Sequence, residues 1–142
     1  MSVPEEVDYR RRLAQGYLLE AREDVRLQRW RSCDDDSQLA VESAAKAVLA
    51  LVGPVPRTHD PGTVLRRELA SGRFSPALGP HVERLAECAE LLGWDVHVQT
   101  DYGDEATGRT PWDLFDEAAA EEALKIAVEA AALSTEVIDQ GP

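Results

Sequence analysis

Residues 39–60, LAVESAAKAVLALVGPVPRTHD, decide the fold of this chain. Five of the first twelve are alanine, which has the highest helix propensity and a side chain small enough for neighbouring backbones to approach closely. Gly53 can end this helix in the left-handed conformation, and the prolines after it prevent its continuation. Asp60, followed by proline, matches an N-cap and a first helical position. The stretch therefore predicts two helices joined by a stiff corner that presents Arg57 and His59.

The segment before this stretch is predicted to be one long helix. Apolar residues recur at i+4 over residues 4–30 and give this segment one continuous apolar stripe. Ser32 and Asp35 match a capping box, which predicts that the alanine-rich helix covers residues 33–52. The connection is then about two residues long, and such a short link makes the two helices antiparallel.

The segment after the stretch is predicted to contain further helices separated by glycine and proline turns. A third helix follows Asp60 and ends at Gly72, a fourth covers residues 80–92, and a closing helix covers residues 116–138. The buried side of the closing helix is predicted to consist of Leu124, Val128, Ala131, Val137 and Ile138. Together these elements predict a single domain, residues 1–142, folded as an all-α, up-and-down bundle of four to five antiparallel helices with a long first helix.

Two segments are predicted not to be helical. Residues 94–98 alternate apolar and polar side chains, which is typical of a short extended segment. Residues 102–108 contain two glycines and two acids and are predicted to form a loop. After that loop, Thr110 and Asp113 match a second capping box, with a proline at the first helical position, and predict a short turn of helix.

The charge of the chain is unevenly distributed. The net charge is −12, yet residues 1–73 hold twelve cations and twelve acids, so the whole excess lies in residues 74–142. This balance argues against a partnership with long nucleic acid, while the arginine-rich first half permits a small anionic ligand. No apolar stretch approaches the roughly 20 residues of a membrane span, and no signal peptide opens the chain. We therefore expect a soluble, cytoplasmic protein without a membrane partner.

Motifs for phosphate loops, metal-binding cysteine and histidine sets, and the G-x-S-x-G elbow are absent. Cys33 and Cys88 are interpreted as structural thiols. Three acids in and directly before the predicted loop could hold Mg²⁺ but lack the regular spacing of a cation site: Asp101, Asp104 and Glu105. The sequence accordingly predicts no metal site and no self-contained enzyme.

The alanine-rich helix with one lysine, followed by P-R-T-H-D at residues 56–60, resembles the signature of the HEPN family of small helical domains. The resemblance extends to the long opening helix, to residues 102–104 and to the acidic, alanine-rich closing helix. It implies a bundle of four or five helices, usually a homodimer. It also implies a prokaryotic protein that is either an RNA-cleaving toxin or a nucleotide-binding companion of a small nucleotidyltransferase.

Ribonucleases of this family resemble one another in an arginine followed, after four to six residues, by a histidine. No arginine stands five to seven positions before His59, His81 or His97. The resemblance therefore favours a non-catalytic nucleotide- or partner-binding module, a companion of a separately encoded nucleotidyltransferase, with no catalytic residue assigned. Two alternatives remain: a ribonuclease toxin of a toxin-antitoxin pair with a relocated active pair, and a structural dimer that docks another protein through its acidic half.

Three candidates for ligand binding lie in or beside the stiff corner that contains Arg57 and His59, which we call the proline corner. Lys46 either pairs with Glu42, one turn earlier, or points into a cleft and meets a phosphate or carboxylate. Arg57 either forms a salt bridge or holds a phosphate beside the N-terminus of the next helix. His59 either contributes to binding or fixes the corner by hydrogen bonding to a neighbouring helix.

Two further candidates lie outside the corner. Arg66 adds a cation on the third helix. Tyr102 either stacks on a base or closes its loop over the core. Members of the HEPN family resemble R-Y-P where this chain has Asp101 followed by tyrosine and glycine, so one cation of the family pattern is an anion here. The ligand implied by the resemblance is an unidentified nucleotide with Mg²⁺.

Overall fold

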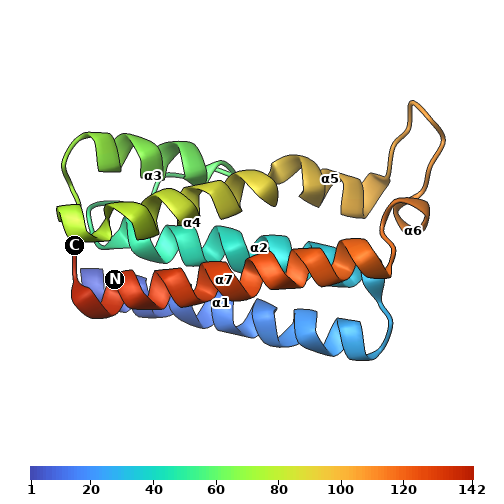
Figure 1. Cartoon of the computed structure of the whole chain (residues 1–142), viewed down its shortest axis with the longest axis horizontal. Coiled ribbons are helices and arrows are strands. Elements are labelled where there is room, and N and C mark those ends of the chain that lie inside the picture. The colour runs from blue at the N-terminus through green and yellow to red at the C-terminus, as the bar shows by residue number, and fades with distance from the viewer.

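The computed structural model describes residues 1–142. The chain forms helices and no strands, in the order α1 (Val3–Arg26), α2 (Trp30–Ala50), α3 (Pro61–Ala70), η1 (Pro76–Leu78, a 3-10 turn), α4 (Gly79–Leu91), α5 (Trp94–Tyr102), α6 (Pro111–Leu114) and α7 (Glu117–Gln140). The prediction of an all-α bundle with a long first helix is confirmed. Figure 1 shows that the long helices lie side by side and that both termini lie at one end of the bundle.

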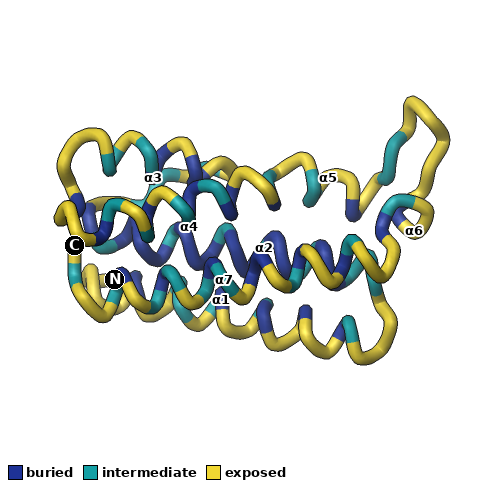
Figure 2. The backbone as a smooth tube through the Cα atoms, viewed as in Figure 1, coloured by how far each residue is buried: buried dark blue, intermediate teal, exposed yellow.

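Helix α2 is the centre of the bundle. It contacts every other α-helix, and its tube in Figure 2 is buried over most of its length. The reason is the small side chains of the deciding stretch, which allow neighbouring helices to approach α2 closely. The alanines that are almost fully buried are Ala40, Ala44, Ala45 and Ala47. Several helices can therefore approach one helix at the same time.

Helix α7 meets α2 through small residues of its own. Ala123, Ala127 and Ala130 are buried, and the Ser134 hydroxyl donates a hydrogen bond to the Ala44 carbonyl oxygen at 2.9 Å. A side chain as short as serine reaches a neighbouring backbone only where two helices lie very close together. The small residues of both helices therefore set the distance between α2 and α7.

The predicted buried side of the closing helix is confirmed in part. Val137 is buried, and Leu124 and Ala131 are partly buried and pack against the core, but Val128 is 38 % exposed. The most buried side of the helix is rich in alanine, and it lies against a surface of α2 that is also lined by alanines. The residues buried in α7 are Ala120, Ala123, Ile126, Ala127, Ala130, Ser134 and Val137.

The predicted boundary between the first two helices is also wrong. Helix α1 ends at Arg26 and α2 begins at Trp30, with Arg29 as an N-cap that makes no side-chain capping bond. The predicted capping box does not form, because the Asp35 carboxylate accepts a hydrogen bond from Thr100 of α5 instead. Gln28 adopts a left-handed conformation with φ of 60° and reverses the chain.

Residues 94–98, predicted to be extended, belong to helix α5. The alternation of apolar and polar residues conceals a helical spacing, since Trp94, His97 and Thr100 recur at i+3. His97 and Thr100 contact Asp35 of α2, and Trp94 stacks on His97. Other local signals are confirmed. Asp60 caps α3 by accepting a bond from the Thr63 amide, and Thr110 forms the predicted capping box at α6.

The residues between α5 and α6 form a loop that projects from the end of the bundle (Figure 1). Cys33 and Cys88 are both buried and free, as expected of structural thiols. No helix of the chain combines the length and the apolar character that crossing a membrane requires.

Candidate functional site

A stripe of polar residues runs along the side of α2 that faces α5 and the proline corner. Its members are spaced by four, seven and four residues and therefore share one helix face: Arg31, Asp35, Glu42 and Lys46. Each carries a charge, and each carboxylate of the stripe has a partner on a neighbouring element. The stripe brings together residues from α2, α5 and the corner.

Lys46 and His59 both contact Glu42. The Lys46 ammonium lies 3.5 Å from one carboxylate oxygen, and His59 Nδ1 lies 3.3 Å from the other. The side chains of Lys46 and Glu42 are each only 12 % exposed. The predicted pair of Lys46 and Glu42 is therefore present. Its positive charge is offset by a partly buried carboxylate, so Lys46 does not offer an unopposed cation to a ligand.

His59 also stacks on Trp94, with ring centroids 3.8 Å apart and planes 16° apart. His97 lies against the same Trp94 ring at 4.7 Å. The His97 ring is held by carboxylates at both nitrogens, at 3.0 Å from Asp35 and 3.7 Å from Asp101. These contacts join the corner to α5 and α2, which supports the architectural interpretation of His59.

Arg57 is exposed and forms no hydrogen bond or ion pair with another side chain. Tyr102 is 69 % exposed, so it does not close its loop over the core. Tyr102 follows Thr100, which contacts Arg31, whereas Lys46 is fifteen residues farther along α2 and thus about 22 Å away. The structure does not bring Tyr102 together with the corner residues.

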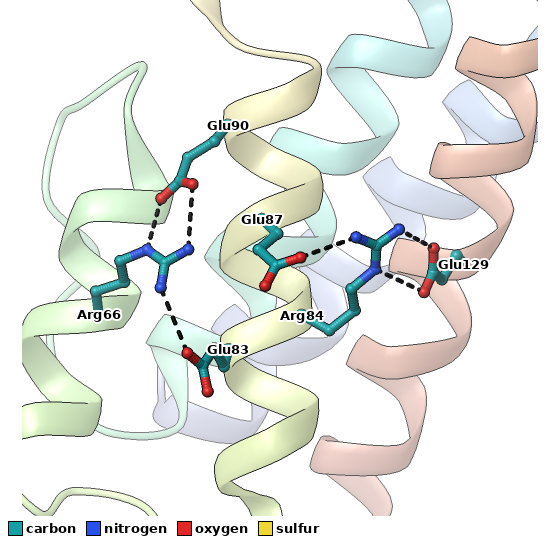
Figure 3. Close-up of polar contacts among 6 residues, drawn as sticks. All are labelled: Arg66, Glu83, Arg84, Glu87, Glu90 and Glu129. Atoms are coloured by element: carbon teal, nitrogen blue, oxygen red, sulfur yellow. Dashed lines mark hydrogen bonds and ion pairs between the residues drawn. The ribbon is translucent and has the colours of Figure 1, made fainter.

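Arg66 is engaged by the neighbouring helix α4. Its guanidinium donates to both oxygens of Glu90, at 2.6 and 3.1 Å, and lies 3.9 Å from Glu83. Figure 3 shows this cluster on one side of α4 and a second arginine, Arg84, on the other side, bound to Glu129 of α7 and to Glu87.

The hydrogen bonds of the Arg66 cluster favour the charged forms of both partners. They raise the pKa of Arg66 and lower the pKa of Glu90. A ligand that bound Arg66 would have to compete with two carboxylates. Arg66 and Arg84 therefore connect α4 to α3 and α7, and neither presents a free cation.

A pocket of about 270 Å³, which we call the turn pocket, lies where α1 turns into α2 and α6 packs against the turn. Sequence reasoning missed it, because its walls come from two segments about 80 residues apart. It contains two arginines and three aromatic rings, and the residues that line it are Gln28, Arg29, Trp30, Arg31, Ser32, Trp112 and Phe115.

The two arginines of the turn pocket have few acidic partners. Arg31 donates to the Thr100 carbonyl oxygen at 2.9 Å and lies over the Trp112 ring, 5.7 Å from its centroid, but forms no ion pair. Arg29 forms only one ion pair, with the Asp24 carboxylate at a distance of 4.0 Å. The turn pocket therefore combines positive charge with exposed aromatic surface.

The histidines of the chain are held by acids. His59 contacts Glu42 and His97 contacts Asp35, while His81 lies 3.2 Å from Glu136. No group of three or more histidine, cysteine, aspartate or glutamate side chains is arranged to hold a metal ion.

Comparison with known proteins gives a family model and a solved structure. The model described as HEPN domain matches residues 7–136. The crystal structure of TT1696 from Thermus thermophilus is similar to this chain with a TM-score of 0.69 and 20 % sequence identity. The similarity covers 92 % of this chain and 97 % of that one, and at this identity it shows the fold alone. No curated protein matches this chain.

Proposed function

This chain belongs to the HEPN domain family, and from that premise we propose that it is a non-catalytic binding module whose ligand is a small nucleotide. The observation that carries the proposal is the pairing of every histidine with a carboxylate and of none with an arginine. Cleavage of RNA by an arginine and histidine pair requires a cation beside the histidine to bind the phosphate. Carboxylates occupy that place at His59, His81 and His97.

The distribution of cations supports a small ligand over a long one. Arg29 and Arg31 lie together in the turn pocket and are weakly paired or unpaired, whereas Lys46 and Arg66 are neutralised by glutamates. A nucleotide needs only two or three such groups for its phosphates. A long strand would also meet the acidic surface of residues 74–142, which repels polyanions.

Titration calorimetry of the purified chain against ATP and GTP with Mg²⁺ is expected to show saturable binding, and incubation with RNA is expected to leave the RNA intact. Lys46→Met is expected to bind nucleotide like the parent, because Glu42 already satisfies the lysine charge. Arg57→Ala removes the free cation of the corner and shows whether that cation contributes to nucleotide binding. RNA cleavage that is lost in His59→Ala would instead support the ribonuclease toxin.

We also propose that the chain forms a homodimer and accompanies a separately encoded nucleotidyltransferase. Support comes from a broad groove of about 600 Å³ between α1 and α7, in which four apolar residues lie among five polar ones; the apolar residues are Leu18, Val128, Ala131 and Ala132. Beside it, Leu19 is an exposed leucine on α1. Apolar residues gathered in this way often mark a protein interface.

Light scattering is expected to give a mass of twice the 15.6 kDa of one chain. Val128→Lys places a charge in the groove and is expected to shift the mass to that of the monomer. Lys125→Glu, at another exposed position of α7, is the control that changes charge without changing the groove. A monomeric parent protein would contradict the dimer and leave the groove for a different protein partner.

A further inference from the structure

The turn pocket is a built feature of the fold. Arg31 is fixed by its bond to the Thr100 carbonyl oxygen, and the backbone that carries Trp112 is the short helix α6, which the capping box of Thr110 and Asp113 holds in place. Phe115 is buried beneath the pocket. A site whose groups are fixed before binding loses less conformational entropy when it takes a ligand.

The two arginines of the turn pocket favour an anion. Arg31 has no carboxylate partner, and the guanidinium of Arg29, which is 61 % exposed at its side chain, has only the distant contact with Asp24. The Ser32 hydroxyl lines the same wall. Arginine presents a planar fork of donors that matches the oxygens of a phosphoryl group, so two arginines and a hydroxyl suit this group better than a lone carboxylate.

The aromatic wall of the turn pocket favours a ring next to that anion. Trp112 is 74 % exposed, although a tryptophan is usually buried to a large extent. The guanidinium of Arg31 lies over its ring, so the cation and the aromatic surface act at one place. An exposed indole offers a flat surface on which a heteroaromatic ring can stack, and such stacking is worth about 1–3 kcal/mol per base.

We infer that the turn pocket binds a phosphate ester that carries an aromatic ring, with the phosphoryl group at Arg29 and Arg31 and the ring against Trp112. A nucleoside monophosphate is the simplest nucleotide that carries both a phosphoryl group and a heteroaromatic ring, so it is the ligand we infer for the turn pocket. The inference rests on the proposed function and adds the site and the ligand class. It moves the nucleotide away from the proline corner, where Lys46 and His59 are already held by Glu42.

The test uses the full chain with two probes, AMP and inorganic pyrophosphate, measured by titration calorimetry. Arg29→Ala is expected to weaken both probes about tenfold, as expected for the loss of a charge-assisted hydrogen bond. Trp112→Leu is expected to weaken AMP about tenfold and to leave pyrophosphate unchanged, because only AMP has a ring to stack. Both side chains are exposed, so these variants leave the core intact.

Two control variants separate the turn pocket from the rest of the surface. Arg12→Ala removes a similarly exposed arginine, paired with Asp8 on α1, and is expected to change neither affinity. Arg57→Ala removes the free cation of the corner and is likewise expected to bind both probes like the parent. Arg31→Ala is expected to weaken both probes, but it also removes the bond to Thr100, so urea unfolding must first show that its stability matches that of the parent.

The outcomes separate the inference from the proposed function. AMP that binds equally to the Arg29 and Trp112 variants but weakly to Arg57→Ala would overturn the inference and leave the nucleotide function in place. Pyrophosphate that binds through Arg29 while AMP, ATP and GTP do not bind would overturn the nucleotide function and retain the phosphoryl site. If neither probe binds but ATP does, the turn pocket is not the site.

Discussion

Replacement of Ala44 by leucine is expected to lower the free energy of unfolding by about 3 kcal/mol, the upper end of the usual range for overpacking a core. Ala44 is 1 % exposed and its carbonyl oxygen accepts the bond from Ser134. On α7, Ser134 contacts Ala44 directly, and Ala130, one turn earlier, is fully buried. The added carbons cannot enter a void, so α7 has to move outward and release the bond from Ser134.

The measurement is urea unfolding followed by circular dichroism at 222 nm, in which the midpoint of Ala44→Leu is expected at a lower urea concentration. Ala118→Leu is the matched control, because it adds the same side chain at an exposed position of α7 and is expected to change stability by less than about 0.5 kcal/mol. An unchanged midpoint for Ala44→Leu would show that the contact between α2 and α7 is looser than the distances indicate.

The stability of the protein is expected to fall as the pH rises from about 4 to about 8. Burial raises the pKa of Asp34 to about 7, with repulsion from Asp116 as a second cause, and burial together with Asp24 raises the pKa of Asp36 to about 8. In the unfolded chain such carboxyls titrate near 3.9. Between these values the folded state holds protons that the unfolded state has released, so stability decreases with pH.

Asp34→Asn is expected to remove the part of this decrease that belongs to Asp34. Its carboxylate is buried with one oxygen, Oδ1, that has no hydrogen-bond partner, so the negative charge is costly there. The substitution keeps the size of the side chain and removes the charge. We expect a gain of about 2 kcal/mol at pH 8, discounted for solvent screening, and little gain at pH 4, where the carboxyl is protonated in the folded state and half protonated in the unfolded state.

Urea unfolding at pH 4 and at pH 8 gives both values in one series. Glu121→Gln is the control, since it removes one acid at an exposed position of α7 and is expected to change stability little at either pH. A gain from Asp34→Asn of the same size at both pH values would show that packing, and not ionisation, is its cause.

Local signals predicted most of the fold. The helix of alanines, the Asp60 cap and the capping box at Thr110 depend on residues within a few positions of one another, and all three are confirmed. The errors arise where a side chain has a distant partner. Ser32 and Asp35 have the spacing of a capping box, but the Asp35 carboxylate is engaged by Thr100, which lies 65 residues away.

The contacts of the candidate site also divide into local ones, which the sequence predicts, and distant ones, which it does not. The pair of Lys46 and Glu42 is local and could be predicted, whereas the contact of Arg66 with Glu90 depends on how α4 lies against α3. Arg31 and Trp112 meet only because α6 returns to the start of α2. No spacing in the sequence predicts a contact between residues so far apart, and therefore the turn pocket can be recognised only in the folded chain.

The central position of α2 determines the order in which the fold can open. Because α2 contacts every other helix, the amide hydrogens in the middle of α2 are expected to exchange with solvent only when the whole bundle comes apart. Helix α3 is short, lies at the edge of the bundle and is held mainly by α4, so it can open alone while the rest stays folded. The proline corner thus connects the helix whose amide hydrogens are most protected from exchange, α2, to the helix whose amide hydrogens are least protected, α3.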